Sequence, residues 1–162
     1  MILQIYTLIH VLISLMGILS GLVVLSGLLN AKRLDGWTAF FLTTTAVTSA
    51  TGFFFPFHGL TPALASGVIS LLVLAVAVFA LYVRKLAGAW RKTYVISALF
   101  ALYANVFVLI VQSFQKLPAL KTIAPTQSEP PFKVAQLLVL VLFVVFTVLA
   151  AIKFKDKPVH AT

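Results

Sequence analysis

The sequence has no cysteine and few charged residues, and these two absences exclude several classes of protein. Without cysteine there is no disulfide, thiolate metal site, iron–sulfur cluster or cysteine nucleophile. Only 9% of the 162 residues are charged and three are acidic, whereas soluble domains have about 25% charged residues. A soluble enzyme, a secreted disulfide scaffold and a disordered tail are therefore excluded.

Catalytic motifs are missing as well. The chain contains no catalytic triad pattern, phosphate loop or metalloprotease helix, and no pair of carboxylates lies within an apolar stretch. Because no acidic residue is expected inside a membrane span, a proton pump with an intramembrane carboxylate is not expected either. The sequence therefore favours a non-enzymatic protein.

Long apolar stretches make up most of the sequence. Hydrophobic residues account for 62% of the chain, and the mean hydropathy is +1.13. Five stretches approach or exceed the roughly 20 apolar residues that a spanning helix needs: 2–29, 37–55, 63–83, 93–115 and 132–152. The prediction is one transmembrane domain over 1–162, an all-α bundle of five helices. The first stretch is expected to remain in place because no basic segment precedes it. Residues 116–131 contain four prolines and are expected to form an outer cap loop without helix.

The basic residues lie between the apolar stretches, and their distribution indicates how the chain is oriented in the membrane. The net charge is +9. Three lysines, Lys116, Lys121 and Lys133, fall on one side, and nine basic residues fall on the other: Lys32, Arg33, Arg84, Lys85, Arg91, Lys92, Lys153, Lys155 and Lys157. Because cytoplasmic loops are enriched in Lys and Arg, we expect the N-terminus outside and the C-terminus in the cytoplasm. Trp37 and Trp90 then fall at the cytoplasmic boundary. The partner that these charges indicate is anionic lipid, not nucleic acid.

Polar residues recur on several of the predicted spans, and helical rise places most of them in the outer half of the bilayer. His10 is the one histidine inside a predicted span, and intramembrane ionisable residues tend to mark sites. A pocket for a small hydrophobic or amphipathic ligand, such as a quinone or a lipid, is the leading hypothesis. Its candidate residues are His10, Ser14, Thr45, Ser49, Ser70, Asn105, Gln112, Gln127 and Glu129.

Other interpretations stay open at this point. Gly17 and Gly21 form a Gly-xxx-Gly pair, which lets another helix approach closely. The chain would then be a structural or accessory subunit, or a small homo-oligomer that acts as a channel or transporter, with the polar residues as interhelical hydrogen bonds. A b-type haem or metal held by His10 and His58, with Glu129 as a further metal ligand, is a weaker alternative, because His58 lies beyond the end of its helix.

Three segments resemble known sequences. They are NVFVLIVQ at 105–112, APTQSEPPF at 124–132, and the Thr-rich second span ending in GFFFP at 52–56. Together they resemble small polytopic inner-membrane proteins of bacteria. The resemblance implies a multi-pass protein of a bacterial inner membrane and transfers no functional residue to this chain.

Overall fold

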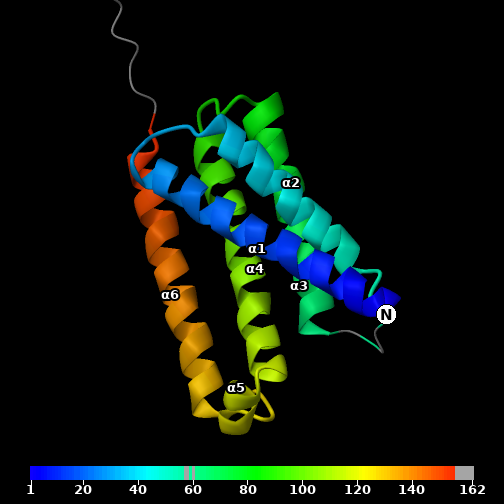
Figure 1. The fold of residues 1–162 in the computed structure, drawn as a ribbon. Helices are drawn as coiled ribbons and strands as arrows, with labels where there is room; N and C mark the ends of the chain where they lie inside the picture. The colour runs from blue at the N-terminus through cyan, green and yellow to red at the C-terminus, as the bar shows by residue number, and fades with distance from the viewer. Residues whose placement is uncertain (57–58, 60, 156–162) are drawn as a thin grey trace, which may run out of the picture.

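The computed structural model describes residues 1–56, 59 and 61–155, and every regular element within them is a helix. Figure 1 shows their arrangement. In chain order they are α1 (Ile2–Leu29), α2 (Asp35–Gly52), α3 (Pro62–Val78), the π-helical turn η1 (Phe79–Val83), α4 (Trp90–Lys116), α5 (Pro118–Ile123) and α6 (Pro130–Lys153). The all-α prediction is confirmed for this part of the chain.

Four of the helical segments are long and apolar enough to cross a membrane. They are Ile2–Leu29, Leu64–Val83, Trp90–Lys116 and Pro130–Lys153. This confirms a multi-pass membrane protein whose surroundings are a lipid bilayer. The predicted second span is also a helix, α2, but seven of its 18 residues are serine or threonine. It does not belong to the set of four.

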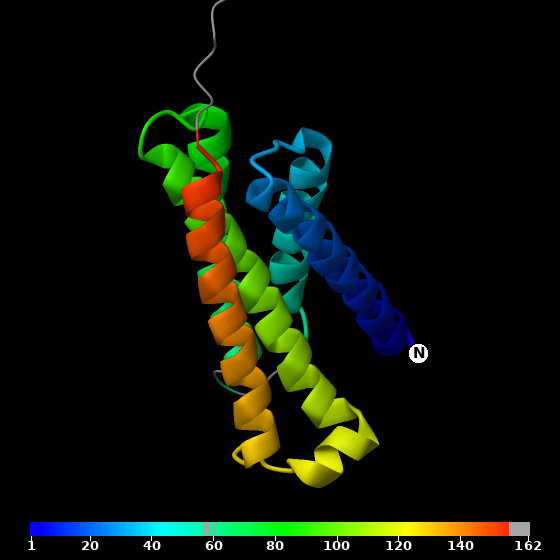
Figure 2. The ribbon, with the colours of Figure 1, turned by 90° about the vertical axis from the view of Figure 1, so that its left-hand side faces the viewer.

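The helices form a bundle from which α1 leans away. α3, α4 and α6 run side by side, while α1 crosses them diagonally and keeps α2 alongside it (Figures 1 and 2). All the buried residues of α1 lie between Gly17 and Leu28, in its second half. The first half of α1 therefore packs mainly on α2 and projects away from the far ends of α4 and α6.

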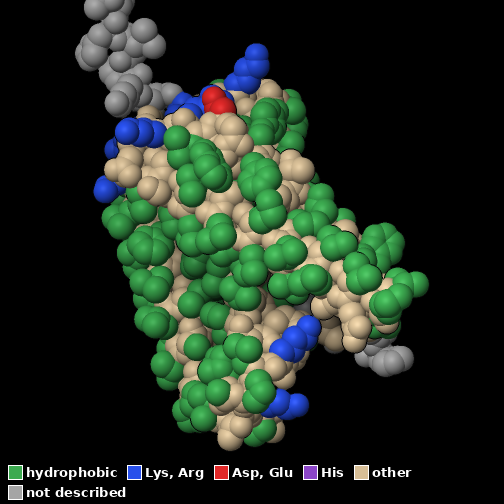
Figure 3. All heavy atoms as spheres, viewed as in Figure 1, with side chains coloured by type: hydrophobic (Ala, Val, Ile, Leu, Met, Phe, Trp, Pro, Cys, Tyr) green, Lys and Arg blue, Asp and Glu red, His purple; other side chains and the backbone are tan. Residues whose placement is uncertain are grey.

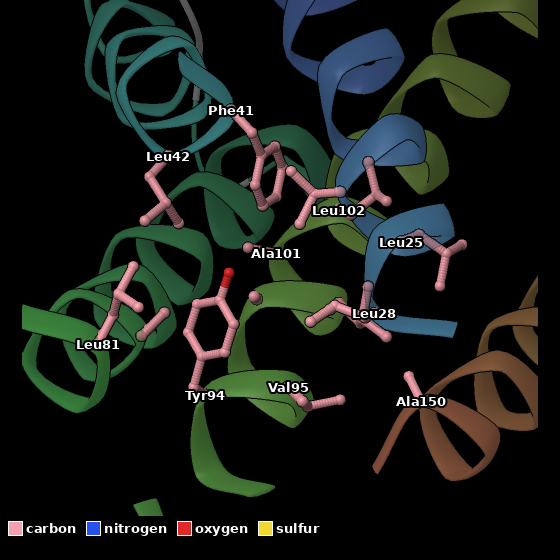
Figure 4. Packing of buried hydrophobic residues seen from close by; sticks show 14 of the residues in the cluster. Leu25, Leu28, Phe41, Leu42, Leu81, Tyr94, Val95, Ala101, Leu102 and Ala150 are labelled. Atoms are coloured by element: carbon pink, nitrogen blue, oxygen red, sulfur yellow. The ribbon is translucent and has the colours of Figure 1, made fainter. Parts of the chain in front are cut away.

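The tightly packed core lies towards the end where α1 finishes and α4 begins. Phe41, Val95, Leu99 and Leu102 are among its fully buried side chains, and Figure 4 shows three of them between the helices. Alanines without any exposed surface separate the larger side chains: Ala77, Ala80, Ala98 and Ala101. Lipid supplies no hydrophobic drive between helices, so close packing at such small residues holds the bundle together.

The cap between α4 and α6 contains a helix, contrary to the expectation for residues 116–131. Pro118 stands at the first position of the six-residue helix α5. Proline fits there because its missing N–H would have no intrahelical partner, and its fixed φ suits a helix start. Counting prolines without their position in the turn produced the wrong prediction.

Basic side chains gather at the two ends of the bundle (Figure 3). Eight of the nine residues predicted to be cytoplasmic flank the ends of α1, η1, α4 and α6 at one end, which we call the cationic end. The ninth, Lys157, lies outside the described residues. Lys116, Lys121 and Lys133 lie at the opposite end, near α5. At the cationic end Trp37 is 51% exposed, and Trp90 packs against Phe79 and lies 5.4 Å from Arg84.

Candidate functional site

A polar seam runs between α1 and α2 in the half away from the cationic end. The two helices are antiparallel, so residues with increasing numbers along α1 contact residues with decreasing numbers along α2. His10 Nδ1 lies 2.9 Å from Thr51 Oγ1, and one turn on Ser14 Oγ lies 3.5 Å from Thr48 Oγ1. A Cβ on Gly17 would lie 3.3 Å from Thr45 Oγ1. We call these paired positions the α1–α2 seam.

The hydrogen bonds at Thr51 favour one tautomer of the neutral His10 ring. The Thr51 hydroxyl has one proton and lies 2.7 Å from the Val47 carbonyl oxygen, to which it donates. Its oxygen therefore accepts from His10 Nδ1–H. In the neutral imidazole the proton at Nδ1 leaves Nε2 as a hydrogen-bond acceptor. No described residue donates to Nε2.

An aromatic wall stands beside this imidazole. The Phe55 ring meets the His10 ring edge to face at 4.9 Å, and the Tyr6 ring lies 4.8 Å from Phe55. The Tyr6 hydroxyl donates to the Thr51 carbonyl oxygen at 2.5 Å. His10 remains partly exposed. The ring is thus held from one side and accessible from another.

Asn105 joins the seam from α4. Its Nδ2 donates to Thr45 Oγ1 at 3.3 Å, and Thr45 itself is fully buried. A Cβ on Gly17 would lie 3.7 Å from the same Asn105 nitrogen. The structure thereby brings together four of the predicted residues, His10, Ser14, Thr45 and Asn105, along one line of contacts.

The remaining predicted residues lie elsewhere. Ser49 of α2 and Ser70 of α3 are 6% and 2% exposed, buried among the helices. Gln112 is partly exposed on α4. Gln127 belongs to the cap: its Nε2 donates to the Val111 carbonyl oxygen at 2.8 Å, which attaches the cap to α4. Among the described residues no hydrogen bond joins these side chains to the residues of the α1–α2 seam.

Glu129 is held by its own loop. One carboxylate oxygen accepts from the Thr126 amide at 3.2 Å and hydroxyl at 2.8 Å, and the other accepts from the Ser128 amide at 3.0 Å. Desolvation alone would raise the pKa of Glu129, but the hydrogen bonds from Thr126 and from backbone amides outweigh it and hold the pKa below its usual value. Glu129 therefore stabilises the loop at residues 126–129, just before α6 begins.

The projecting end of α1 faces the end of α4 across a hollow in the surface. Figure 3 shows this hollow between the outer end of α1 and the end formed by α4 and α5, with basic side chains at its edge. Lys116, the last residue of α4, lies within electrostatic range of His10. The hollow therefore lies beside the half of α1 that carries the seam.

Two further hollows lie away from the seam. One, of about 10 Å³, has room for a single water molecule and lies at the cationic end between Arg33, Thr38, Tyr94 and Phe154. The other follows the outer face of α1 and measures about 520 Å³. None of the predicted ligand-binding residues lines either of them.

Gly17 and Gly21 face helices of the same chain. A Cβ on Gly21 would come within 2.5 Å of Leu102 Cδ1 and 2.9 Å of the Phe41 ring. This face is therefore filled by α2 and α4 and is not open to a partner protein in this conformation. Among the described residues no three His, Asp or Glu side chains gather into a metal site. His58 lies outside them, so its pairing with His10 stays a prediction.

Sequence reasoning passed over Tyr6, Thr51 and Phe55. A signal for Thr51 lies in the register of the antiparallel pair. Ser14 meets Thr48 and Gly17 meets Thr45, and the same register brings His10 to the end of α2 at Thr51 and Gly52. The register of the pair was needed to use it.

Comparison with protein-family models, with curated proteins and with solved structures finds no match to this chain. Functional inference therefore starts from the geometry of the seam.

Proposed function

We propose that this protein binds a small amphipathic ligand at the α1–α2 seam, with His10 Nε2 as the acceptor of a ligand hydroxyl. A quinol, or a lipid that carries a hydroxyl group, has the donor that this nitrogen requires. The apolar part of the ligand lies against Tyr6 and Phe55. Binding of this kind, with mostly apolar walls and a few placed polar groups, is typical of small-molecule sites.

One observation carries the proposal: the hydrogen bond from His10 Nδ1 to Thr51 Oγ1 at 2.9 Å. A histidine that served only to join two helices would need only this bond. Here the bond also orients the ring and leaves an acceptor nitrogen on a partly exposed side chain. Asn105 has a second amide proton beyond the one it gives to Thr45, and this proton is a donor for a ligand carbonyl.

The membrane arrangement that we propose has five spans, with α2 as the fifth. At 1.5 Å per residue, its 18 residues extend about 27 Å, close to the roughly 30 Å of the hydrocarbon core. Four threonines of α2 meet α1, which shields them from lipid: Thr44, Thr45, Thr48 and Thr51. Thr43 is exposed. The concentration of basic residues at the cationic end supports a cytoplasmic C-terminus and an outer N-terminus, as in a bacterial inner membrane.

Ligand binding tests this function. The full chain in mild detergent is titrated with a short-chain benzoquinol and, separately, with the corresponding quinone, and binding is followed by calorimetry. His10→Ala removes the acceptor and is expected to weaken quinol binding roughly two- to tenfold, the usual value of one hydrogen bond. Asn105→Ala is expected to weaken quinone binding to a similar extent.

Thr7→Ala is the matched control. Thr7 lies one turn before His10, and its hydroxyl donates to the Leu3 carbonyl oxygen of its own helix. This variant should bind both probes like the parent. Unchanged affinity in both the His10 and the Asn105 variants, with helix content preserved, would rule out the seam as the binding site.

A further inference from the structure

A groove runs along the membrane-facing side of α1. It measures about 520 Å³, and Leu19, Leu22 and Val23 line its apolar part, while Lys32 lies at the end nearest the cationic end of the bundle. Leu19 and Leu22 are 64% and 44% exposed. We call this hollow the α1 groove. It lies in the opposite half of α1 from His10, so it is separate from the seam.

The end of α1 is built to hold Lys32 at the mouth of this groove. The Lys32 amide donates back to the Gly27 carbonyl oxygen at 2.8 Å, and Ala31 has a left-handed φ of 54°. Together these features form a Schellman motif, which reverses the chain direction at a helix end. A Cβ on Gly27 would lie 2.8 Å from Leu34 Cδ1, so glycine lets Leu34 lie against the helix as a wall of the groove.

The groove ends in an uncompensated positive charge. The neighbouring Arg33 is engaged with Asp35, its nitrogen 2.8 Å from the carboxylate oxygen. Among the described residues the Lys32 side chain has neither an ion pair nor a hydrogen bond. Ser26, which also lines the groove, offers a hydroxyl group close to the same end. The mouth of the groove is therefore suited to an anion with several oxygen acceptors.

The length of the groove matches one leaflet. From Leu19 to Asn30, the residue that caps the C-terminal end of α1 and also lines the groove, the helical rise is about 16 Å. Half the hydrocarbon core of a bilayer is about 15 Å. A molecule that extends from the charged mouth to the apolar end thus spans the depth of an acyl chain below its headgroup.

We propose that the α1 groove binds an anionic glycerophospholipid, with the phosphate at Lys32 and one acyl chain along Leu19, Leu22 and Val23. The attraction of lysine to anionic headgroups selects the lipid, and the apolar face holds its chain. Charge complementarity decides the occupant, because the headgroup of a zwitterionic lipid brings its own cation with its phosphate and leaves the mouth of the groove with a net positive charge.

Native mass spectrometry of the full chain in detergent, titrated with phosphatidylglycerol or with phosphatidylcholine of the same chains, tests the proposal. The parent protein should retain phosphatidylglycerol preferentially. Lys32→Gln should lower its affinity about fivefold, the attraction of one lysine. Lys92→Gln removes an equal charge from the same end outside the groove, and it should change the affinity less than twofold.

Two further measurements separate this site from diffuse charge and from a simple anion site. Leu22→Trp fills the apolar part and should lower phosphatidylglycerol binding in a protein of unchanged helix content. Glycerol phosphate, which has the headgroup without chains, should not displace the bound lipid. Equal losses in the two lysine variants, no lipid preference in the parent, full binding by Leu22→Trp, or displacement by glycerol phosphate would each overturn the proposal.

Discussion

Replacing Gly21 by alanine is the sharpest test of how α1 packs. A Cβ at this position would lie 2.5 Å from Leu102 Cδ1 and 2.9 Å from Phe41 Cε2. Ordinary carbon contacts are about 3.5–4.0 Å, so the overlap is about 1.0–1.5 Å at Leu102 and about 0.6–1.1 Å at Phe41. Leu102 and Phe41 are both fully buried, so neither side chain can move aside into solvent.

The magnitude follows from two opposing effects. Overpacking of a well-filled core costs about 1–3 kcal/mol, and an overlap of this size on two buried side chains belongs in the upper half of that range. Alanine in place of a helical glycine returns about 0.5–1 kcal/mol. We therefore expect Gly21→Ala to lower the free energy of unfolding by about 1–2 kcal/mol.

The assay is unfolding in mixed micelles with increasing sodium dodecyl sulfate, followed by far-ultraviolet circular dichroism. Gly17→Ala is the matched comparison on the same face, because its Cβ would meet Thr44 and Thr45 at 3.3 Å, a contact that small shifts relieve. It should change the stability by less than about 0.5 kcal/mol. At Gly36 a Cβ has nothing within 4 Å, and Gly36→Ala should not destabilise the protein. If Gly21→Ala is as stable as the parent, the packing of α1 against Leu102 and Phe41 described above is wrong.

Three other outcomes are expected. Ala31→Gly should raise the stability in the same assay by about 0.5–1 kcal/mol, because glycine adopts the φ of 54° without steric cost; a loss of stability would contradict the Schellman geometry. The pKa of Glu129 is lowered in the folded protein, so its stabilising effect on the cap is complete above the unfolded pKa and is lost as the pH falls through the folded pKa. Protection of the Thr126 amide against hydrogen exchange should fall over that acidic range, and Glu129→Gln should remove this pH dependence. The same protection at every pH in the parent protein would contradict the stabilising role of Glu129. Thr51→Val removes the acceptor of His10 Nδ1 and should weaken quinol binding about as much as His10→Ala; full binding would show that Thr51 does not orient the ring.

The sequence anticipated the helices well where apolar runs are long and uninterrupted. The first run, 2–29, coincides with α1 (Ile2–Leu29), since loss of hydropathy at Asn30 and Lys32 coincides with the Schellman turn. The prediction failed at α5, where helix formation depends on Pro118 standing at the first helical position. Proline content alone does not contain that information.

The candidate site was only partly accessible from the sequence. His10, Ser14 and Gly17 share a face by helical spacing, so that side of the seam was foreseeable. Which α2 residues meet them depends on the register between the two helices, and the overlooked Thr51 is the direct partner of His10. Gln127 and Glu129 were expected at a pocket mouth, whereas their hydrogen bonds to Val111, Thr126 and Ser128 hold the cap.

Composition and pattern by themselves determined that the chain is a helical multi-pass membrane protein, because the need to satisfy backbone hydrogen bonds in lipid makes long apolar segments helical. They also determined that basic residues concentrate at one end of the bundle, because these residues lie in alternate segments between the apolar stretches. Only the tertiary structure decided that α1 leans out of the bundle, that its glycine face is covered by α2 and α4, and that His10 Nδ1 meets Thr51 Oγ1. Those features depend on the angle and register at which helices pack, and these are set by many small contacts between residues far apart in the chain.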